Sequence, residues 1–435
     1  MKEKNNTVPM FTVIYPYKFN DFLYNLLEIE FFKSYCETEV WDVSYIINRE
    51  FAEKIKADRS HRKEIIEIKS IKQFLMLLVN LRKAAKERRV CVLNEVVVEN
   101  FSSLICNFMI KVLIRNTGLA VLDVYNGGVQ IRTFEEKSAG DRKNYLAKLM
   151  AYVKRTETHK EALRMFKGFF CLALARCFNV LPTTHRLVAG DEWIDVARRH
   201  GAEKKGVKFV YGSAWDYSND LLKRIENTGS SGTKQRIAIL LDGAGPAFGS
   251  DHEHLKRKPA LTSDVWYPSL TRFLDKVEKQ TGVVAEIAGH YKSAHPPIAP
   301  CFGNRRVHYG KTGELVRNSE FVITRMSAAV SYAVIYRKPV IYIYSDELKE
   351  DRLAMDNIRM MAEALGQEPV NIDEFSGNIS ALLAVDESKY MAYEKACLTS
   401  ANPPRPNVQV ILEDVMGIKV DTDLFRKGAL NADIR

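Results

Sequence analysis

The sequence contains no pair of cysteines in C-x-x-C spacing, although it has seven cysteines among 435 residues. Their scattered positions and odd number argue against a disulfide framework and against a structural zinc site. Cysteines within apolar stretches are typical of small core residues. We therefore expect a protein of a reducing compartment.

Long apolar runs are also missing. The most apolar segment, Met165 to Leu181, is interrupted by Lys167 and Arg176 and is too short to span a membrane. Residues 1–10 are polar and do not resemble the apolar region of a secretory signal. We expect a cytoplasmic protein that is soluble or, at most, peripheral on the inner face of the cell membrane.

Two common ligand signatures are absent as well. Gly243 and Gly245 follow an apolar run, but Phe248 stands where a dinucleotide fingerprint requires glycine. His252 and His254 are spaced for chelation from an extended loop, yet no further cluster of metal-ligating residues accompanies them. We therefore expect neither a metal nor a cofactor.

The charge balance favours anionic partners. The chain has 64 Lys and Arg against 54 Asp and Glu, a net charge of +10. Such an excess suits nucleic acid, phospholipid headgroups or a phosphorylated substrate, and a basic surface without function fits equally well. Because no nucleic-acid-reading module is present, we expect no nucleic-acid partner.

The first third of the chain alternates β-rich runs with amphipathic segments of helical length. The expected strands are 11–15, 40–43, 90–93 and 119–124, and the expected helices are 19–35, 71–87 and 97–116. Strands that alternate with helices in this way indicate a parallel sheet with helices on its faces.

The middle of the chain changes to a basic helix. Residues 141–178 carry many cations beside an apolar stripe, which suits either an anionic membrane surface or an ordinary exposed helix. Glycines and short apolar runs near 200–210 mark a domain junction. We expect a first domain over 1–205, a second over 206–405 and a C-terminal tail over 406–435.

The second half contains a compact βαβ pattern. A strand over 321–324, a helix over 327–336 and a strand over 340–344 follow earlier strands at 237–241 and 283–288. The small residues Ser327 and Ala328 open the helix where the preceding strand ends. Backbone N–H groups at such a turn can bind phosphate; alternatively, Ser327 is only a helix N-cap.

Two further groups follow strands of this half. His290 and Lys292 come after the strand over 283–288 and could hold a diphosphate without a metal. Lys311, Thr312 and Glu314 lie where a short strand meets a helix; Thr312 could cap that helix and Glu314 could accept ribose hydroxyls.

These motifs resemble the GT-B glycosyltransferases, in particular those of bacterial capsule and lipopolysaccharide synthesis. The similarity covers mainly residues 237–345. It rests on Ile287–His290, Thr312–Leu315 and Ser327–Ala329, with Tyr291 in place of a family proline and Ala328 in place of a hydroxyl residue.

The resemblance implies an α/β fold of two Rossmann-like domains with parallel sheets that face a central cleft. It further implies a nucleotide-sugar donor on the second domain and a glycan or glycolipid acceptor on the first. His290 and Ser327 would face the donor phosphates, and Thr312 and Glu314 would lie near the nucleoside.

Inverting transfer needs a base that deprotonates the acceptor hydroxyl. Asp251 is the first candidate, and Glu95, which follows the strand over 90–93, is the second. A sugar-nucleotide 2-epimerase or a CDP-polyol phosphotransferase would use the same fold. A nucleic-acid-binding protein or a catalytically inactive scaffold is the alternative of another class. The oligomeric state is open.

Overall fold

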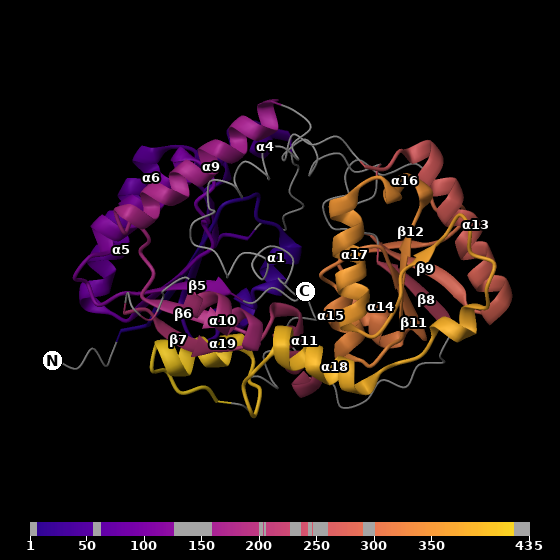
Figure 1. Cartoon of the computed structure of the whole chain (residues 1–435). Coiled ribbons are helices and arrows are strands. Elements are labelled where there is room, and N and C mark those ends of the chain that lie inside the picture. The colour runs from indigo at the N-terminus through magenta and orange to yellow at the C-terminus, as the bar shows by residue number, and fades with distance from the viewer. Residues whose placement is uncertain are drawn as a thin grey trace.

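The computed structural model describes residues 7–54, 62–125, 159–199, 203, 206–226, 236–241, 246, 260–289 and 301–421. Within these residues the chain forms two lobes, each built on a parallel sheet (Figure 1). Both sheets carry helices on their two faces. This arrangement confirms the predicted fold class of two Rossmann-like α/β domains.

The first sheet has seven described strands in the order β3-β2-β1-β4-β5-β6-β7. Every neighbouring pair is parallel. The strands are β1 (Met10–Tyr15), β2 (Glu37–Asp42), β3 (Ile65–Glu67), β4 (Val90–Asn94), β5 (Ala120–Tyr125), β6 (His185–Val188) and β7 (Lys208–Tyr211).

Its helices are α1 (Asp21–Leu26), α2 (Ile29–Lys33), α3 (Ser44–Ile47), α4 (Arg49–Lys54), α5 (Ile71–Glu87), α6 (Phe101–Ile114), α9 (His159–Cys177), α10 (Asp191–Arg199) and α11 (Trp215–Glu226). The single helix expected over 19–35 is divided at Glu28, which adopts a left-handed φ of 58°. Alternate residues of β1 face opposite cores, because side chains alternate along a strand: Phe11 packs towards α1, and Ile14 packs towards α5 and α6.

The second sheet has six described strands in the order β10-β9-β8-β11-β12-β13, all parallel. The strands are β8 (Ile237–Leu241), β9 (Val284–Gly289), β10 (Val307–Tyr309), β11 (Phe321–Thr324), β12 (Val340–Tyr344) and β13 (Val370–Asn371). Its helices are α13 (Ser263–Thr281), α14 (Thr312–Asn318), α15 (Val330–Ile335), α16 (Asp346–Lys349), α17 (Arg352–Ala364) and α18 (Glu387–Tyr393), with a 3₁₀ turn at Ile379–Leu382 and a π-helical turn, η6, at Glu394–Leu398.

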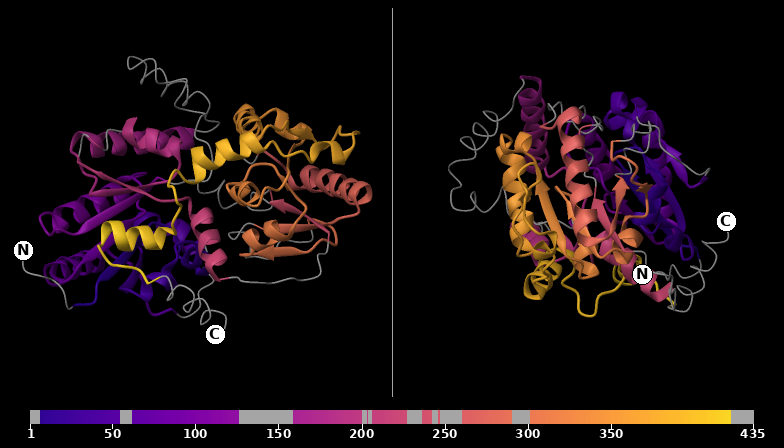
Figure 2. Two further views of the ribbon diagram at one scale, coloured as in Figure 1. Left: turned by 90° about the horizontal axis from the view of Figure 1, so that it is seen from below. Right: turned by 90° about the vertical axis from the view of Figure 1, so that its right-hand side faces the viewer.

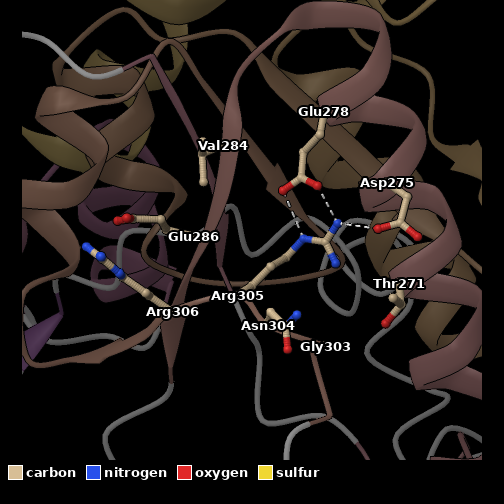
Figure 3. Close-up of a pocket in the computed structure, with 9 residues that line it drawn as sticks. All are labelled: Thr271, Asp275, Glu278, Val284, Glu286, Gly303, Asn304, Arg305 and Arg306. Atoms are coloured by element: carbon tan, nitrogen blue, oxygen red, sulfur yellow. Dashed lines mark hydrogen bonds and ion pairs between the residues drawn. The ribbon is translucent and has the colours of Figure 1, made fainter.

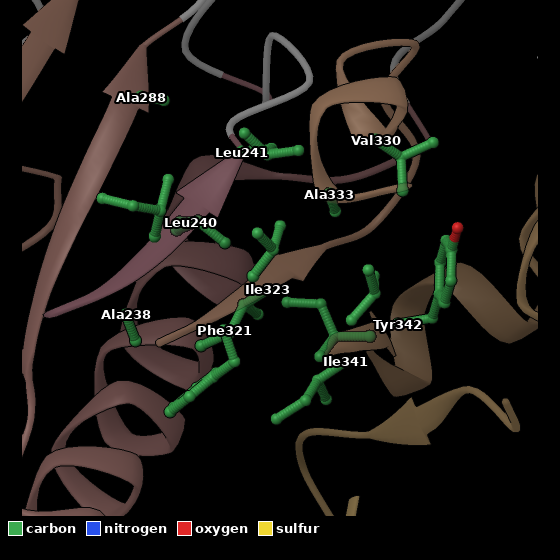
Figure 4. Packing of buried hydrophobic residues seen from close by; sticks show 14 of the residues in the cluster. Ala238, Leu240, Leu241, Ala288, Phe321, Ile323, Val330, Ala333, Ile341 and Tyr342 are labelled. Carbon is green, nitrogen blue, oxygen red and sulfur yellow. The ribbon is translucent and has the colours of Figure 1, made fainter. Parts of the chain in front are cut away.

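Apolar strands fill the centre of the second domain. Phe321 and Ile323 of β11 lie between the side chains of the neighbouring strands β8 and β12 (Figure 4). Strands this apolar are typical of a parallel sheet that is covered on both faces.

Two predicted boundaries are wrong. The junction expected at 205/206 falls before β7, which pairs with β6 as the seventh strand of the first sheet. The segment expected as a tail from 406 returns to the first domain: α19 (Asn407–Val410) and the π-helical turn η7 (Ile411–Val415) follow a cis Asn402–Pro403 bond. Val408 and Ile411 are buried in the core on the α1 face of the first sheet (Figures 1 and 2).

A buried polar cluster fixes this return. The Glu28 carboxylate accepts hydrogen bonds from the Ser218 hydroxyl and, at 2.8 Å, from the Val408 amide. The Ser218 hydroxyl in turn accepts from the Asn407 amide at 2.6 Å. Burial raises the pKa of Glu28 to about 7, although both hydrogen bonds oppose that rise. The cluster joins α2, α11 and α19.

Candidate functional site

Both sheets change direction between their first and fourth strands. The chain proceeds outward from β1 to β3 on one side and from β4 on the other, and the second sheet repeats this pattern around β8 and β11. In open parallel sheets, ligands bind outside the carboxyl ends of the two strands at such a switch point. Each domain therefore offers one place where a site is expected.

The Ser327 turn lies at the switch point of the second sheet. Thr324 ends β11 and pairs with Leu241, the last residue of β8. Three residues later the Ser327 side chain is partly buried, and Ala328 is exposed. The sequence-predicted pair therefore lies at the edge where the topology places a ligand.

The turn has a different local form from the one predicted. The helix begins at Val330 rather than at Ser327, and the Ser327 hydroxyl accepts a hydrogen bond from the Ala329 amide at 3.2 Å. Ser327 thus stabilises the turn in the manner of a cap. The Ser327 and Ala328 amides have no backbone acceptor among the described residues, and they remain able to donate to an anion.

The Lys311 to Glu314 segment lies beside this turn. Gly313 is buried against Tyr332, and a Cβ at Gly313 would stand 2.8 Å from the Tyr332 ring. This contact packs the first turn of α14 against α15, which brings the two predicted donor-binding segments together. The proposed cap is wrong, however, because Lys311 occupies the N-cap position and Thr312 is the first helical residue.

Two hydroxyls at the same edge were missed from the sequence. Thr324 ends β11 and Ser345 follows β12, and both side chains are fully buried. Neither hydroxyl has a hydrogen-bond partner within the described part of the chain. Buried hydroxyls normally have a partner, in protein or in water. The sequence did offer a signal for them. Both hydroxyls lie at the carboxyl ends of adjacent strands, and that position is also what singled out Ser327.

The second domain's other predicted residues lie outside the described residues. They are Asp251, His290 and Lys292, together with the spaced pair His252 and His254. Gly289, the residue before His290, ends β9 and lies against Tyr309 of β10. No group of three or more His, Cys, Asp or Glu in the described ranges is arranged to hold a metal ion.

Glu95 lies at the switch point of the first sheet. It follows β4 directly, and its amide donates to the Ile14 carbonyl of β1 at 3.0 Å. One carboxyl oxygen, Oε1, is out of contact with solvent and has no hydrogen-bond partner in the described structure. Burial, followed by the charge of Asp123, raises the pKa of Glu95 to about 7.

Neighbouring side chains fix the Glu95 backbone. The Asn94 amide group donates to Asn107 Oδ1 at 2.9 Å, and the Asn107 amide group donates to the Val96 carbonyl at 2.9 Å. Asn94 and Asn107 are both buried. This pair holds the turn between β4 and α6, so the position of Glu95 is set by the core of the first domain.

Helix α11, through which the chain leaves the first domain, also contacts α15, the helix that follows the Ser327 turn. Asp216 of α11 accepts a hydrogen bond from Ser331 at 2.5 Å, and Asp220 accepts one from Tyr336 at 2.6 Å. Burial is the main cause of the raised pKa of Asp216. These bonds tie α15 to α11, so the Ser327 turn is positioned from both domains.

A cavity of about 530 Å³ lies elsewhere on the second domain, between α13 and the loop before β10 (Figure 3). Its lining includes Val284, which begins β9, and Arg306, which precedes β10. Arg305 is held at 2.7 Å from both Asp275 and Glu278. Because this cavity is at the amino ends of the strands and its Arg305 is paired, it is not the candidate site.

Comparison with known proteins gives structural neighbours only. No protein-family model matches the sequence, and no curated protein matches it. Similar solved structures include the UDP-GlcNAc 2-epimerase of Methanocaldococcus jannaschii, at 10% identity and a TM-score of 0.40 over 98% of both chains.

Two other similar structures are those of a rhamnosyltransferase and of MurG. The spinosyn rhamnosyltransferase SpnG is 13% identical, with a TM-score of 0.40 over 93% of this chain and 99% of its own. MurG of Acinetobacter baumannii is 8% identical, with a TM-score of 0.36 over 94% of this chain and 99% of its own. The neighbours thus include both 2-epimerases and a rhamnosyltransferase.

Proposed function

We propose that this protein is a glycosyltransferase that moves a sugar from a nucleotide-activated donor to a cell-surface glycan or glycolipid acceptor. The donor binds to the second domain and the acceptor to the first. One observation carries the proposal: two sheets with the same switch-point topology present complementary groups. These are backbone amides at Ser327 without a backbone acceptor in the described structure, and a carboxyl group of raised pKa at Glu95.

The Ser327 turn supports donor binding. Its amides and the proton of the Ser327 hydroxyl suit the oxygens of a diphosphate, and the small side chains allow a phosphate to approach the backbone. Lys311, which is exposed at the start of the adjacent helix, would add a positive charge. The same donors would stabilise the nucleoside diphosphate as the bond from its terminal oxygen to the sugar breaks.

Glu95 supports the acceptor half of the reaction. A base with a pKa near the working pH is deprotonated in a large fraction of molecules and is still basic enough to remove a proton efficiently. Glu95 would take the proton of the acceptor hydroxyl as the hydroxyl oxygen attacks the anomeric carbon. The other roles stay predictions: Asp251 as an alternative base, and donor binding by His290, Lys292, Thr312 and Glu314.

The first test is nucleotide binding. We expect one of UDP, CDP, GDP or CMP to raise the melting temperature, because a ligand that binds only the folded state stabilises it. Ser327→Ala should weaken that binding about tenfold, since a hydrogen bond to a charged group is lost. Ser388→Ala, which removes another serine hydroxyl on α18, is the matched control. Failure of all four nucleotides to bind, or unchanged binding by Ser327→Ala, would contradict the proposal.

The second test identifies the reaction. The protein is incubated with the sugar nucleotide selected above, with and without glycan acceptors, and the products are separated by mass. Transfer predicts a product only when acceptor is present. A free or epimerised sugar formed without acceptor would assign epimerase activity, and release of CMP from a CDP-polyol would assign phosphotransfer.

A further inference from the structure

Three helices of the first domain expose large apolar side chains on their outer surface. The helices are α5, α6 and α9, which lie next to one another because α6 contacts both of the others (Figure 1). We call this surface the α5–α6–α9 face. Its exposed apolar residues are Ile71, Leu75, Met76 and Val79 of α5, Phe101, Ile105, Phe108 and Val112 of α6, and Leu163, Phe166 and Phe170 of α9.

The exposed residues of α6 form one stripe. Phe101, Ile105, Phe108 and Val112 recur at the spacing of a single helix face. The opposite face of α6 is buried and includes Cys106 and Ile110 in the core of the domain. The helix is therefore apolar on both sides, which core packing alone does not require.

The apolar stripe continues onto α9. The rings of Phe101 and Phe170 are 6.4 Å apart. Phe166 and Leu163 stand one and two turns before Phe170, respectively, on a similar side of the helix. Cys171 and Ala175 of α9 face inward and pack with Leu104. A contiguous apolar surface of this kind marks a site of interaction with a partner or a membrane.

The three helices are also rich in positive charge. The sequence of α6 contains no acidic residue, and α5 and α9 together contain only Glu87 and Glu161. Among the side chains that the structure describes, the cations of the three helices are Lys72, Arg82, Lys83, Lys86, Lys111, Lys167 and Arg176. Apolar side chains flanked by Lys and Arg suit an anionic bilayer, in which the apolar groups enter the acyl region and the cations contact headgroups.

We propose that the α5–α6–α9 face docks the protein on an anionic phospholipid surface. The charge selects this occupant over a second copy, because a twofold contact of the face with itself would bring like charges together. Within the described residues no helix is long and apolar enough to cross a membrane, and the proposed mode is contact at the interface. The inference stands independently of the proposed transfer, because it concerns binding without substrate.

The experiment is sedimentation of the full chain with large unilamellar vesicles of phosphatidylcholine, with and without about 30% phosphatidylglycerol, which makes the surface strongly anionic. Wild type should sediment with the anionic vesicles and be released by salt. Ile105→Gln/Phe108→Gln should bind at least about tenfold more weakly, because two penetrating side chains are lost.

The matched control is Val265→Gln/Met391→Gln on the second domain. Its two side chains are 47% and 56% exposed, against 43% and 53% for Ile105 and Phe108, so both double variants remove similar exposed apolar surface. The control should bind as wild type does. Circular dichroism and the urea midpoint verify that each variant is folded.

Three results would overturn the proposal. They are absence of wild-type binding to the anionic vesicles, equal binding to neutral vesicles, and equal loss in the two double variants. Light scattering supplies a fourth, since a dimer in solution that Ile105→Gln/Phe108→Gln dissociates would assign the face to a second copy of the chain.

Discussion

The two sheets share one strand order but differ in the groups at their switch points. At the first sheet, charged side chains on strands away from the switch point are paired: Lys18 lies 2.7 Å from Glu67 of β3, and Arg186 of β6 lies 2.5 Å from Asp123 of β5. At the second, the uncharged hydroxyl residue Thr324 ends β11, and another, Ser345, follows β12.

This difference divides the chemistry between the domains. A carboxylate beside the Ser327 turn would repel a bound phosphate, and a turn of amides and hydroxyls cannot deprotonate an alcohol at neutral pH. Glu95 is instead placed in the first domain, where burial raises its pKa. The same backbone topology thus serves two roles through a few residues at its strand ends.

The largest expected effect is on turnover. Glu95→Gln should lower kcat by about 10²- to 10⁴-fold, because a general base contributes that much, while nucleotide binding stays unchanged. In the wild type, kcat should rise with pH through about 7 and then level off, since burial places the Glu95 pKa there and the base acts when deprotonated. Turnover and nucleotide affinity are measured separately.

Glu99→Gln provides the matched control for this variant. Glu99 is exposed, lies four residues further along the same loop and accepts a hydrogen bond from Tyr17 at 3.1 Å. It should retain nearly all activity. Equal activity of Glu95→Gln and wild type would contradict a catalytic base in the first domain, and with it the division of roles between the two domains.

The next expected effect is on stability: Glu95→Gln, which should lower kcat, should make the protein more stable. Burial raises the Glu95 pKa from 4.5 to about 7, so the folded state disfavours the charged form. The resulting destabilisation is absent below pH 4.5, grows between 4.5 and 7, and is constant above 7. Glu95→Gln lacks it and should be more stable than wild type at neutral pH by on the order of 2 kcal/mol.

Urea unfolding of both proteins at pH 4.5, 6 and 8 checks this prediction, since the difference in unfolding free energy should widen with pH. A constant difference would indicate that the Glu95 carboxyl is solvated in the folded protein. The comparison isolates Glu95 because Glu28, whose pKa is also raised to about 7, is present in both proteins.

Local sequence patterns predicted the second domain well. Strands expected at 237–241, 321–324 and 340–344 are found with those bounds. Their apolar runs are bounded by turn residues, and a buried parallel strand leaves a strong local signal of this kind. The position of the Ser327 turn followed from strand order, because carboxyl ends of parallel strands share one edge.

Features that depend on long-range packing were not predicted. The return of α19 to the first core is visible only through contacts such as Glu28 with Val408, which are 380 residues apart. The three-residue strand β3 is too short for a periodic signal. The start of α15 shifted from Ser327 to Val330 because the Ser327 hydroxyl stabilises a turn instead.

The smallest effect tests the unpartnered hydroxyls of the second domain against a paired one in the first. Thr324→Val replaces a buried hydroxyl without a partner in the described structure by a group of the same shape, and should stabilise the ligand-free protein by about 1 kcal/mol. Thr38→Val removes a hydroxyl that donates to the Cys36 carbonyl at 3.2 Å, and should destabilise it by about 1 kcal/mol.

Urea midpoints of the two variants, measured without nucleotide, decide between two states of the Thr324 hydroxyl. Opposite signs would mean that the second switch point keeps an unsatisfied donor in the absence of ligand. Equal destabilisation would mean that Thr324 already has a partner, such as a buried water. The second sheet would then share the paired state of the first, and the contrast between the two switch points would rest on Glu95 and the Ser327 amides alone.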